Sequence, residues 1–175
     1  TVTFTDPTGT VNLSAALEDG IAVAETDLLP AGAYDVTATY AGNVQFEGSS
    51  SLATPLVVRK YASQTTLTSD PNPSLVNGWL SFHVEVGDVS VAAVNAQGDL
   101  FPSGIVTLTD TTGVISLTGT LDQGYVDLSP TQLAEGTYSV TATYAGDDRY
   151  EPSTSAVLVQ VVNRHKTKAS LTVEP

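Results

Sequence analysis

The chain contains a long internal repeat. When it is displaced by 104 positions, residues 1–71 align with residues 105–175 without a gap, and more than a third of the aligned pairs are identical. The longest identical block, residues 36–42, recurs as residues 140–146. A period of this length is a whole domain, much longer than the roughly 20–50 residues of a solenoid repeat. The sequence therefore predicts a series of similar domains.

The register of the repeat predicts how the chain is divided. Residues 1–61 match the later part of a repeat and have no counterpart of residues 62–104, which include two expected strands. Residues 62–165 form one complete repeat, and residues 166–175 match the first strand of a following repeat. We therefore expect the first part to lack its first strands or to depend on a neighbouring chain.

Composition and charge exclude several classes of protein. The chain has 6 basic and 19 acidic residues, and its net charge of −13 argues against nucleic-acid binding, which requires clustered Lys and Arg. It has no cysteine, which excludes disulfides, cysteine metal sites and thiol catalysis. No apolar run approaches the roughly 20 residues of a membrane helix, so membrane insertion is not expected.

Apolar and polar residues alternate with a period of two, which is typical of strands with one buried face. In residues 79–86, for example, Leu80, Phe82, Val84 and Val86 share one face. The complete repeat is expected to have strands near residues 64–69, 79–86, 104–109, 114–120, 124–129, 137–144 and 156–163. Seven short strands in about 100 residues predict an all-β fold of tandem immunoglobulin-like β-sandwiches. An odd number of antiparallel strands puts the two chain ends at opposite poles, so that such domains can join end to end.

A Gly-x-Tyr motif occurs at the same place in both copies. Gly136 lies just before the sixth strand of the complete repeat and Tyr138 lies at its start, and Gly32 and Tyr34 are their counterparts. This arrangement is typical of a tyrosine corner, in which the phenol bonds to nearby backbone. We expect the two glycines to form the turn before the strand. For each tyrosine alone, ordinary core packing explains its position about as well.

Three motifs resemble the bacterial Ig-like repeats that occur in tandem in large surface proteins. Residues 67–73 read Leu-Thr-x-x-Pro-Asn-Pro, residues 1–6 and 104–110 contain Val-Thr-x-Thr-Asp, and residues 31–42 and 135–147 contain Gly-x-Tyr-x-Val-Thr-Ala-Thr-Tyr-Ala-Gly. The resemblance covers nearly the whole chain. It implies extracellular display on a stalk, adhesin or surface filament, and it carries no catalytic residue. The connection over residues 88–103 is longer than the pattern predicts and could be an extra edge strand or a functional loop.

The histidines and lysines do not suggest an enzyme. His83 falls on the outward face of an expected strand and His165 in a linker, so no Ser-His-Asp arrangement can be assembled. Two histidines without cysteine give too few ligands for a typical zinc site. No expected core strand contains the lysine that an intramolecular isopeptide bond would need.

A group of acidic residues is a weak candidate for calcium. Four of them follow strands at the pole expected to face the preceding domain: Asp88, Asp122, Asp147 and Asp148. Calcium prefers carboxylate and carbonyl oxygens, and an ion here would stiffen the joint. The alternative is a solvated acidic face, which we favour because the first copy has Asn43 and Val44 in place of the two consecutive aspartates. No other cofactor is expected.

The basic residues lie almost entirely in the expected linkers. Five of the six occur there: Arg59, Lys60, Arg164, Lys166 and Lys168. We expect them to pair with the acidic poles of neighbouring domains, at about 0–1 kcal/mol for each exposed pair. The alternative is that linkers simply tolerate Lys and Arg.

The sequence as a whole predicts a non-enzymatic structural spacer of an extracellular stalk, adhesin or surface filament. Its partners would be neighbouring repeats of the same chain or identical chains in a fibre. One alternative is a filament subunit in which residues 167–173 add a strand to another chain. The other is a carbohydrate-binding adhesive module that uses Trp79, Phe101 and residues 88–103. Four aromatic residues could form its sugar-stacking platform: Trp79, Tyr125, Phe101 and Tyr150. The repeat register favours packing for Tyr150, and core or rim packing also explains Trp79.

Overall fold

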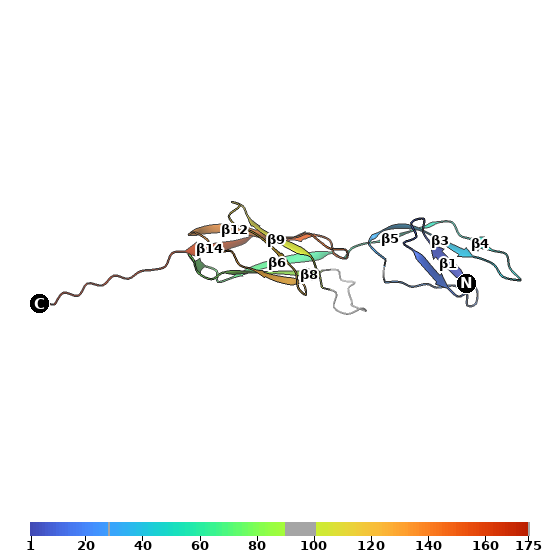
Figure 1. Cartoon of the computed structure of the whole chain (residues 1–175), viewed down its shortest axis with the longest axis horizontal. Helices are drawn as coiled ribbons and strands as arrows, with labels where there is room; N and C mark the ends of the chain where they lie inside the picture. The colour runs from blue at the N-terminus through green and yellow to red at the C-terminus, as the bar shows by residue number, and fades with distance from the viewer. Residues whose placement is uncertain (28, 90–100, 175) are drawn as a thin grey trace. The chain divides into compact units, whose positions relative to one another are not determined.

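The computed structural model describes residues 1–27, 29–89 and 101–174. It confirms the all-β fold, because the described residues form strands, turns and bends and no helix. In these residues nothing resembles a helix that could cross a membrane. The chain divides into two compact units, Thr1–Lys60 (unit 1) and Tyr61–Pro175 (unit 2) (Figure 1).

Unit 2 is a sandwich of two sheets. The larger sheet has the order β10-β9-β12-β14-β7, and β13 pairs with β12. The smaller sheet has the order β11-β8-β6. All pairs are antiparallel except the one between β14 and β7. The strands are β6 (Ser63–Asp70), β7 (Ser74–Leu75), β8 (Ser81–Asp88), β9 (Ile105–Asp110), β10 (Ser116–Thr120), β11 (Tyr125–Leu128), β12 (Gly136–Tyr144), β13 (Ser153–Thr154) and β14 (Leu158–Asn163).

The core of unit 2 lies between these sheets. Alternate residues of β8 and of β9 and β12 pack into one cluster and are almost fully buried: Phe82, Val84, Val86, Val106, Leu108, Tyr138, Val140, Ala142 and Tyr144. Burial of apolar area at about 25 cal/mol per Å² is the main force that holds the two sheets together.

Each of the seven expected strands of the complete repeat is present, and all their ends agree within two residues. The strand expected from residue 79 begins instead at Ser81, because Gly78 N donates a hydrogen bond to Leu75 O at 2.8 Å and closes a turn just before it. The two-residue strands β7 and β13 were not predicted.

Unit 1 repeats the larger sheet. Its strands are β1 (Val2–Thr5), β2 (Asn12–Ala15), β3 (Gly32–Tyr40), β4 (Ser49–Ser50) and β5 (Thr54–Val58). The pairing matches unit 2 at the same displacement of 104, so that Val2 lies opposite Tyr40 just as Val106 lies opposite Tyr144. Among the described residues of unit 1 there is no second sheet.

The C-terminal segment, expected to be the first strand of a following repeat, forms no strand over residues 164–174.

Candidate functional site

A buried carboxylate closes the β9–β10 hairpin. One Asp110 oxygen accepts hydrogen bonds from the Thr112 hydroxyl and from Thr112 N at 2.9 Å, and the other accepts one from Ile115 N at 2.6 Å. In unit 1, Asp6 makes the same bonds to Thr8 and Val11. An aspartate that bonds to backbone two residues later favours a tight turn.

These hydrogen bonds change the acidity of both aspartates. Burial disfavours the charged form of Asp110, but the bonds from Thr112 and Ile115 outweigh it and lower the pKa of Asp110 below its ordinary value. For Asp6 the hydrogen bond from the Thr8 side chain is the main cause, and the pKa of Asp6 is also lowered. The sequence indicates a turn at both positions, since the two copies share an Asp-x-Thr-Gly pattern, but it does not show that the carboxylates are buried.

The tyrosines at the start of β3 and β12 bond back to the preceding turn. The Tyr138 phenol donates to Ala134 O at 3.0 Å, and the Tyr34 phenol donates to Pro30 O at 2.7 Å. Both side chains are buried. Each links the beginning of a strand to backbone four residues upstream, which is the geometry of a tyrosine corner.

The expectation that Gly32 and Gly136 form the turns is wrong. Each is the first residue of its strand, and neither is among the glycines with positive φ. The structure gives a steric reason for glycine, because a Cβ on Gly32 would lie 3.2 Å from the Tyr34 phenol oxygen. On Gly136 it would lie 3.7 Å from the Tyr138 ring. The two glycines leave space for the tyrosine rings.

Asp147 organises the loop between β12 and β13. One carboxylate oxygen accepts hydrogen bonds from Ser103 N and Oγ, both at 2.9 Å, and the other accepts from Arg149 N at 2.8 Å and Tyr150 N at 2.7 Å. Burial disfavours the charged carboxylate, but these bonds outweigh it and lower the pKa of Asp147. Asn43 makes the equivalent backbone bonds in unit 1. The loop therefore needs an oxygen acceptor at this position and not a charge.

This loop also holds the first residue of unit 2. Tyr61 N donates to Arg149 O at 2.7 Å, Glu151 N donates to Tyr61 O at 2.9 Å, and the Tyr61 and Tyr150 rings lie 5.8 Å apart. Gly146 permits the turn, because its φ is +82° and a Cβ would lie 2.9 Å from Tyr150 O.

Several pairings place the four calcium candidates at the same end of unit 2. Asp88 lies opposite Ser63 at the start of β6, Asp147 and Asp148 are in the loop beside Tyr61, and Asp122 forms the turn before β11. Among the side chains that the structure describes, which do not include that of Asp88, no three acidic or histidine residues are close enough to share a metal ion. The shared end was expected, and the described side chains there do not form a ligand set.

Tyr144, at the end of β12, has a buried phenol near this loop. Its oxygen makes no hydrogen bond of good geometry with the described residues. Burial is the main reason that the pKa of Tyr144 is raised well above its ordinary value, and the Asp147 carboxylate adds to the effect.

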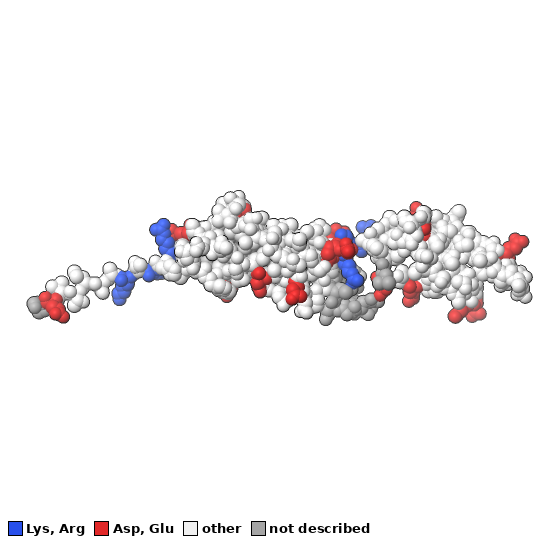
Figure 2. Space-filling model, in the orientation of Figure 1, with Lys and Arg blue, Asp and Glu red and all other residues white. Residues whose placement is uncertain are grey.

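Of the five linker bases, Arg164 has an ion pair within its own unit. Its Nε lies 2.7 Å from Glu135 Oε2, and both side chains are substantially exposed. Arg59, Lys166 and Lys168 are exposed, and Lys60 is half-buried. Figure 2 shows how little of the visible surface is basic. The expected pairing with neighbouring domains stays a prediction.

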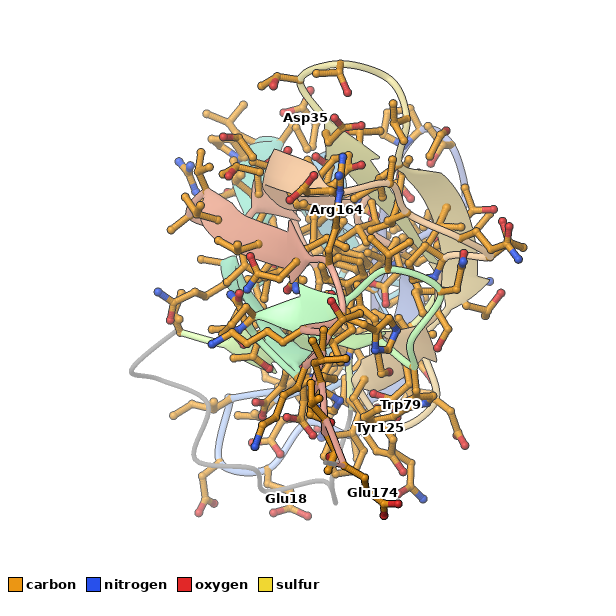
Figure 3. The ribbon with its side chains drawn as sticks, turned by 90° about the vertical axis from the view of Figure 1, so that its left-hand side faces the viewer. Glu18, Asp35, Trp79, Tyr125, Arg164 and Glu174 are labelled. Atoms are coloured by element: carbon orange, nitrogen blue, oxygen red, sulfur yellow. The ribbon has the colours of Figure 1, made fainter. Side chains whose placement is uncertain are left out.

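The aromatic residues considered for carbohydrate do not form one platform. Trp79 and Tyr125 project to the same side in Figure 3, but Tyr125 lies opposite Glu85, about 20 Å along the strand from Trp79 at roughly 3.3 Å per residue. Phe101 packs beside Gly124, and Tyr150 is buried. Residues 90–100 of the long connection lie outside the described residues.

His83 lies on the outward face of β8, as expected. Its Nδ1 is 2.8 Å from Asp127 Oδ1, and its ring is 5.9 Å from that of Tyr125. The contact joins β8 to β11 on the solvent side of the smaller sheet. His165 lies after β14, where its Nε2 is 3.2 Å from Val76 O.

The fold defines a class of protein, that of tandem β-sandwich domains with immunoglobulin-like strand order. The sequence gives the family: residues 1–59 and 67–163 match the model of the bacterial Ig-like domain (group 3), and the chain belongs to this family.

Comparison with solved structures finds fibronectin(III)-like modules of CbhA from Clostridium thermocellum. The sequence identity is 16%, the match covers 99% of this chain and 83% of that chain, and the TM-score is 0.40. A comparison with curated proteins gives no match.

Proposed function

We propose that this chain is a non-enzymatic spacer from an extracellular stalk, adhesin or surface filament. The observation that carries the proposal is the path of the chain through unit 2. The chain enters unit 2 at Tyr61, beside the loop after β12. It leaves after β14, which ends at Asn163, next to β7 and near the start of β12. Entry and exit are therefore separated by the length of β12, which is about 30 Å for nine residues in a strand.

The repeat supports this proposal. Units 1 and 2 share the register of their larger sheets residue for residue, so the same strand framework occurs in two consecutive copies. The side chains that are hydrogen-bonded most extensively, such as Asp110 and Asp147, serve turns and loops. Neighbouring repeats are the proposed partners, and the cell surface or a surface filament is the proposed location.

A display assay tests the spacer function. One, two or four copies of the whole chain are inserted between a cell-surface anchor and a small binding head, and binding of a large bead-bound receptor is measured. We expect binding to increase with copy number and to exceed that obtained with Gly/Ser linkers of equal residue count, because a folded unit keeps its length. Equal binding with both kinds of insert would contradict the proposal.

The two alternatives are less well supported. The counterpart of residues 167–173 is the first strand, β6, which pairs with β8 alone, and the described part of unit 1 has no strand equivalent to β8. A donated tail would therefore find no neighbour of that kind there. Carbohydrate binding would have to use separated aromatic residues. Glycan-array binding of the chain that Trp79→Ala removes would favour it over the spacer.

A further inference from the structure

The turn between β7 and β8 contains the one Asn-Gly pair of the sequence, Asn77 and Gly78. Both residues are exposed, and Asn77 has a φ of +56°. A single hydrogen bond closes the turn, from Gly78 N to Leu75 O at 2.8 Å. No hydrogen bond to a described residue holds the Asn77 carboxamide. The side chain is therefore free to turn towards the backbone that follows it.

An asparagine before a glycine can react with its own backbone. Glycine has no side chain to hinder the approach, and its backbone is permissive. Here Gly78 N would attack Asn77 Cγ and close a five-membered succinimide ring, while the amide nitrogen of Asn77 leaves as ammonia with the proton of Gly78 N. Water then opens the ring. Attack at Cγ gives aspartate, and attack at the main-chain carbonyl carbon gives isoaspartate, in which the chain continues through Cγ.

The other described asparagines are less suited to this reaction. Asn72 precedes Pro73, whose nitrogen carries no hydrogen, and Asn43 uses its side-chain oxygen to accept two backbone hydrogen bonds. Asn12 and Asn163 lie in β2 and β14, where the extended backbone is held in register with a neighbouring strand. The turn between β7 and β8 is therefore the described site best suited to the reaction.

The closing hydrogen bond of the turn opposes the reaction, because Gly78 N must leave Leu75 O before it can reach Asn77 Cγ. The turn is weakly held, however, since β7 has only two residues and Trp79 is 66% exposed. Segments with few buried contacts open locally at low free energy. Folding therefore slows the reaction and does not prevent it.

We propose that Asn77 is a site of spontaneous deamidation through a succinimide, and that the isoaspartyl product loosens the exit of unit 2. The turn is joined to that exit, because Val76 N donates to Asn163 O at 2.9 Å and His165 Nε2 lies 3.2 Å from Val76 O. Isoaspartate adds a methylene group to the main chain within the turn, so the closing hydrogen bond no longer spans the same length. The inference goes beyond the spacer function and does not depend on it.

The test is the 175-residue chain kept in mildly alkaline buffer over several weeks, with and without urea. Tandem mass spectrometry of proteolytic fragments follows the mass gain at each asparagine, and an isoaspartyl methyltransferase labels the isoaspartyl product. We expect Asn77 to convert at least tenfold faster than the other described asparagines of the folded chain. It should convert more slowly than the same residue in urea, because the turn must open first.

Asn77→Gly is the matched control. Glycine adopts the positive φ without strain, so the turn is kept while the reacting carboxamide is removed. We expect the variant to lose most of the early ammonia release of the parent chain. The proposal is overturned if the variant releases as much ammonia as the parent, or if Asn77 stays unreacted in the folded chain while it converts in urea.

A second measurement tests the structural consequence. Chromatography separates the isoaspartyl form, and NMR compares amide exchange at Val76, which we expect to be at least tenfold faster than in the parent chain. Asn77→Asp carries the same added charge on an unchanged backbone and should exchange like the parent. Unchanged exchange in the isoaspartyl form, or equal loosening in Asn77→Asp, overturns the proposed effect on the exit of unit 2. The display assay of the spacer function is unaffected by either result.

Discussion

Two tyrosines of β12 differ in how their phenol oxygens are satisfied. Tyr138 donates to Ala134 O at 3.0 Å, whereas the Tyr144 phenol has no well-formed bond to a described residue. We expect Tyr138→Phe to lower the free energy of unfolding of unit 2 by about 1 kcal/mol, the usual net contribution of one hydrogen bond. Denaturant titration measures this as a lower midpoint with an unchanged slope.

Tyr144→Phe is the matched comparison for that experiment. It removes a buried phenol oxygen that makes no hydrogen bond of good geometry with a described residue, although the Asp147 carboxylate lies near it. The loss of stability should therefore be smaller than for Tyr138→Phe. If both variants lost the same free energy, the Tyr144 phenol would have a partner, and the distinction between the two tyrosines would be wrong.

Asp110 should make the stability of unit 2 depend on pH. Its pKa in the folded chain is lower than the ordinary value of 3.8, so its contribution is complete above that pH and is lost as pH falls through the folded pKa. Asp110→Asn should cost about 1 kcal/mol or more at neutral pH, because an amide cannot accept on both sides. The variant should also lose less stability than the parent between pH 4 and pH 2.

Denaturation midpoints measured across this pH range test the prediction. Asp127→Asn is the control, since Asp127 is exposed and its pairing with His83 lies on the surface. If the free energy of unfolding falls equally for Asp110→Asn and for the parent between pH 4 and pH 2, the Asp110 carboxylate does not cause the pH dependence.

Strand packing makes Gly119 and Leu128 interdependent. A Cβ on Gly119 would lie 2.8 Å from Leu128 Cδ2, so Gly119→Ala should destabilise unit 2 by about 1–3 kcal/mol through overpacking. In a Leu128→Ala background the same change should cost less, because the colliding methyl groups are gone. A double-mutant cycle measures the coupling. Additive effects would contradict the packing argument.

The acidic loop gives a prediction about calcium. The Asp147 oxygens already accept four hydrogen bonds, and Asn43 organises the corresponding loop without charge. Calcium requires roughly six to eight oxygen ligands, which this loop does not assemble. The melting curve should therefore be the same in excess chelator and in millimolar calcium. A rise of several degrees with calcium would revive the calcium hypothesis.

Strand alternation made most of the fold predictable from sequence. Residues such as Phe82 and Val140 marked the buried faces, and the repeat fixed the register. The pattern could not reveal β7 or β13, because two-residue strands have no alternation. It misassigned Gly136, since a glycine beside a turn resembles a turn residue and its packing against the Tyr138 ring is a tertiary contact. The sequence indicated a turn at Asp110 but not the burial of its carboxylate, because burial depends on the packed fold.

The chain as a whole contains an internal control for the stability of its units. Residues 36–42 and 140–146 are identical in sequence, so their intrinsic amide exchange rates are closely matched. Their surroundings differ, since Val140, Ala142 and Tyr144 are fully buried whereas Val36 and Ala38 are only partly buried. Any difference in exchange between these segments therefore reports the covering of the sheet and not the local sequence.

We expect β3 to exchange about 100-fold faster than β12, or more, because each loss of about 1.4 kcal/mol in opening free energy increases exchange tenfold. Heating should likewise melt unit 1 first and unit 2 in a later transition. NMR distinguishes the two segments, since each amide has its own resonance. If residues 36–42 and 140–146 are equally protected from amide exchange in the monomeric chain, one sheet is enough for full stability.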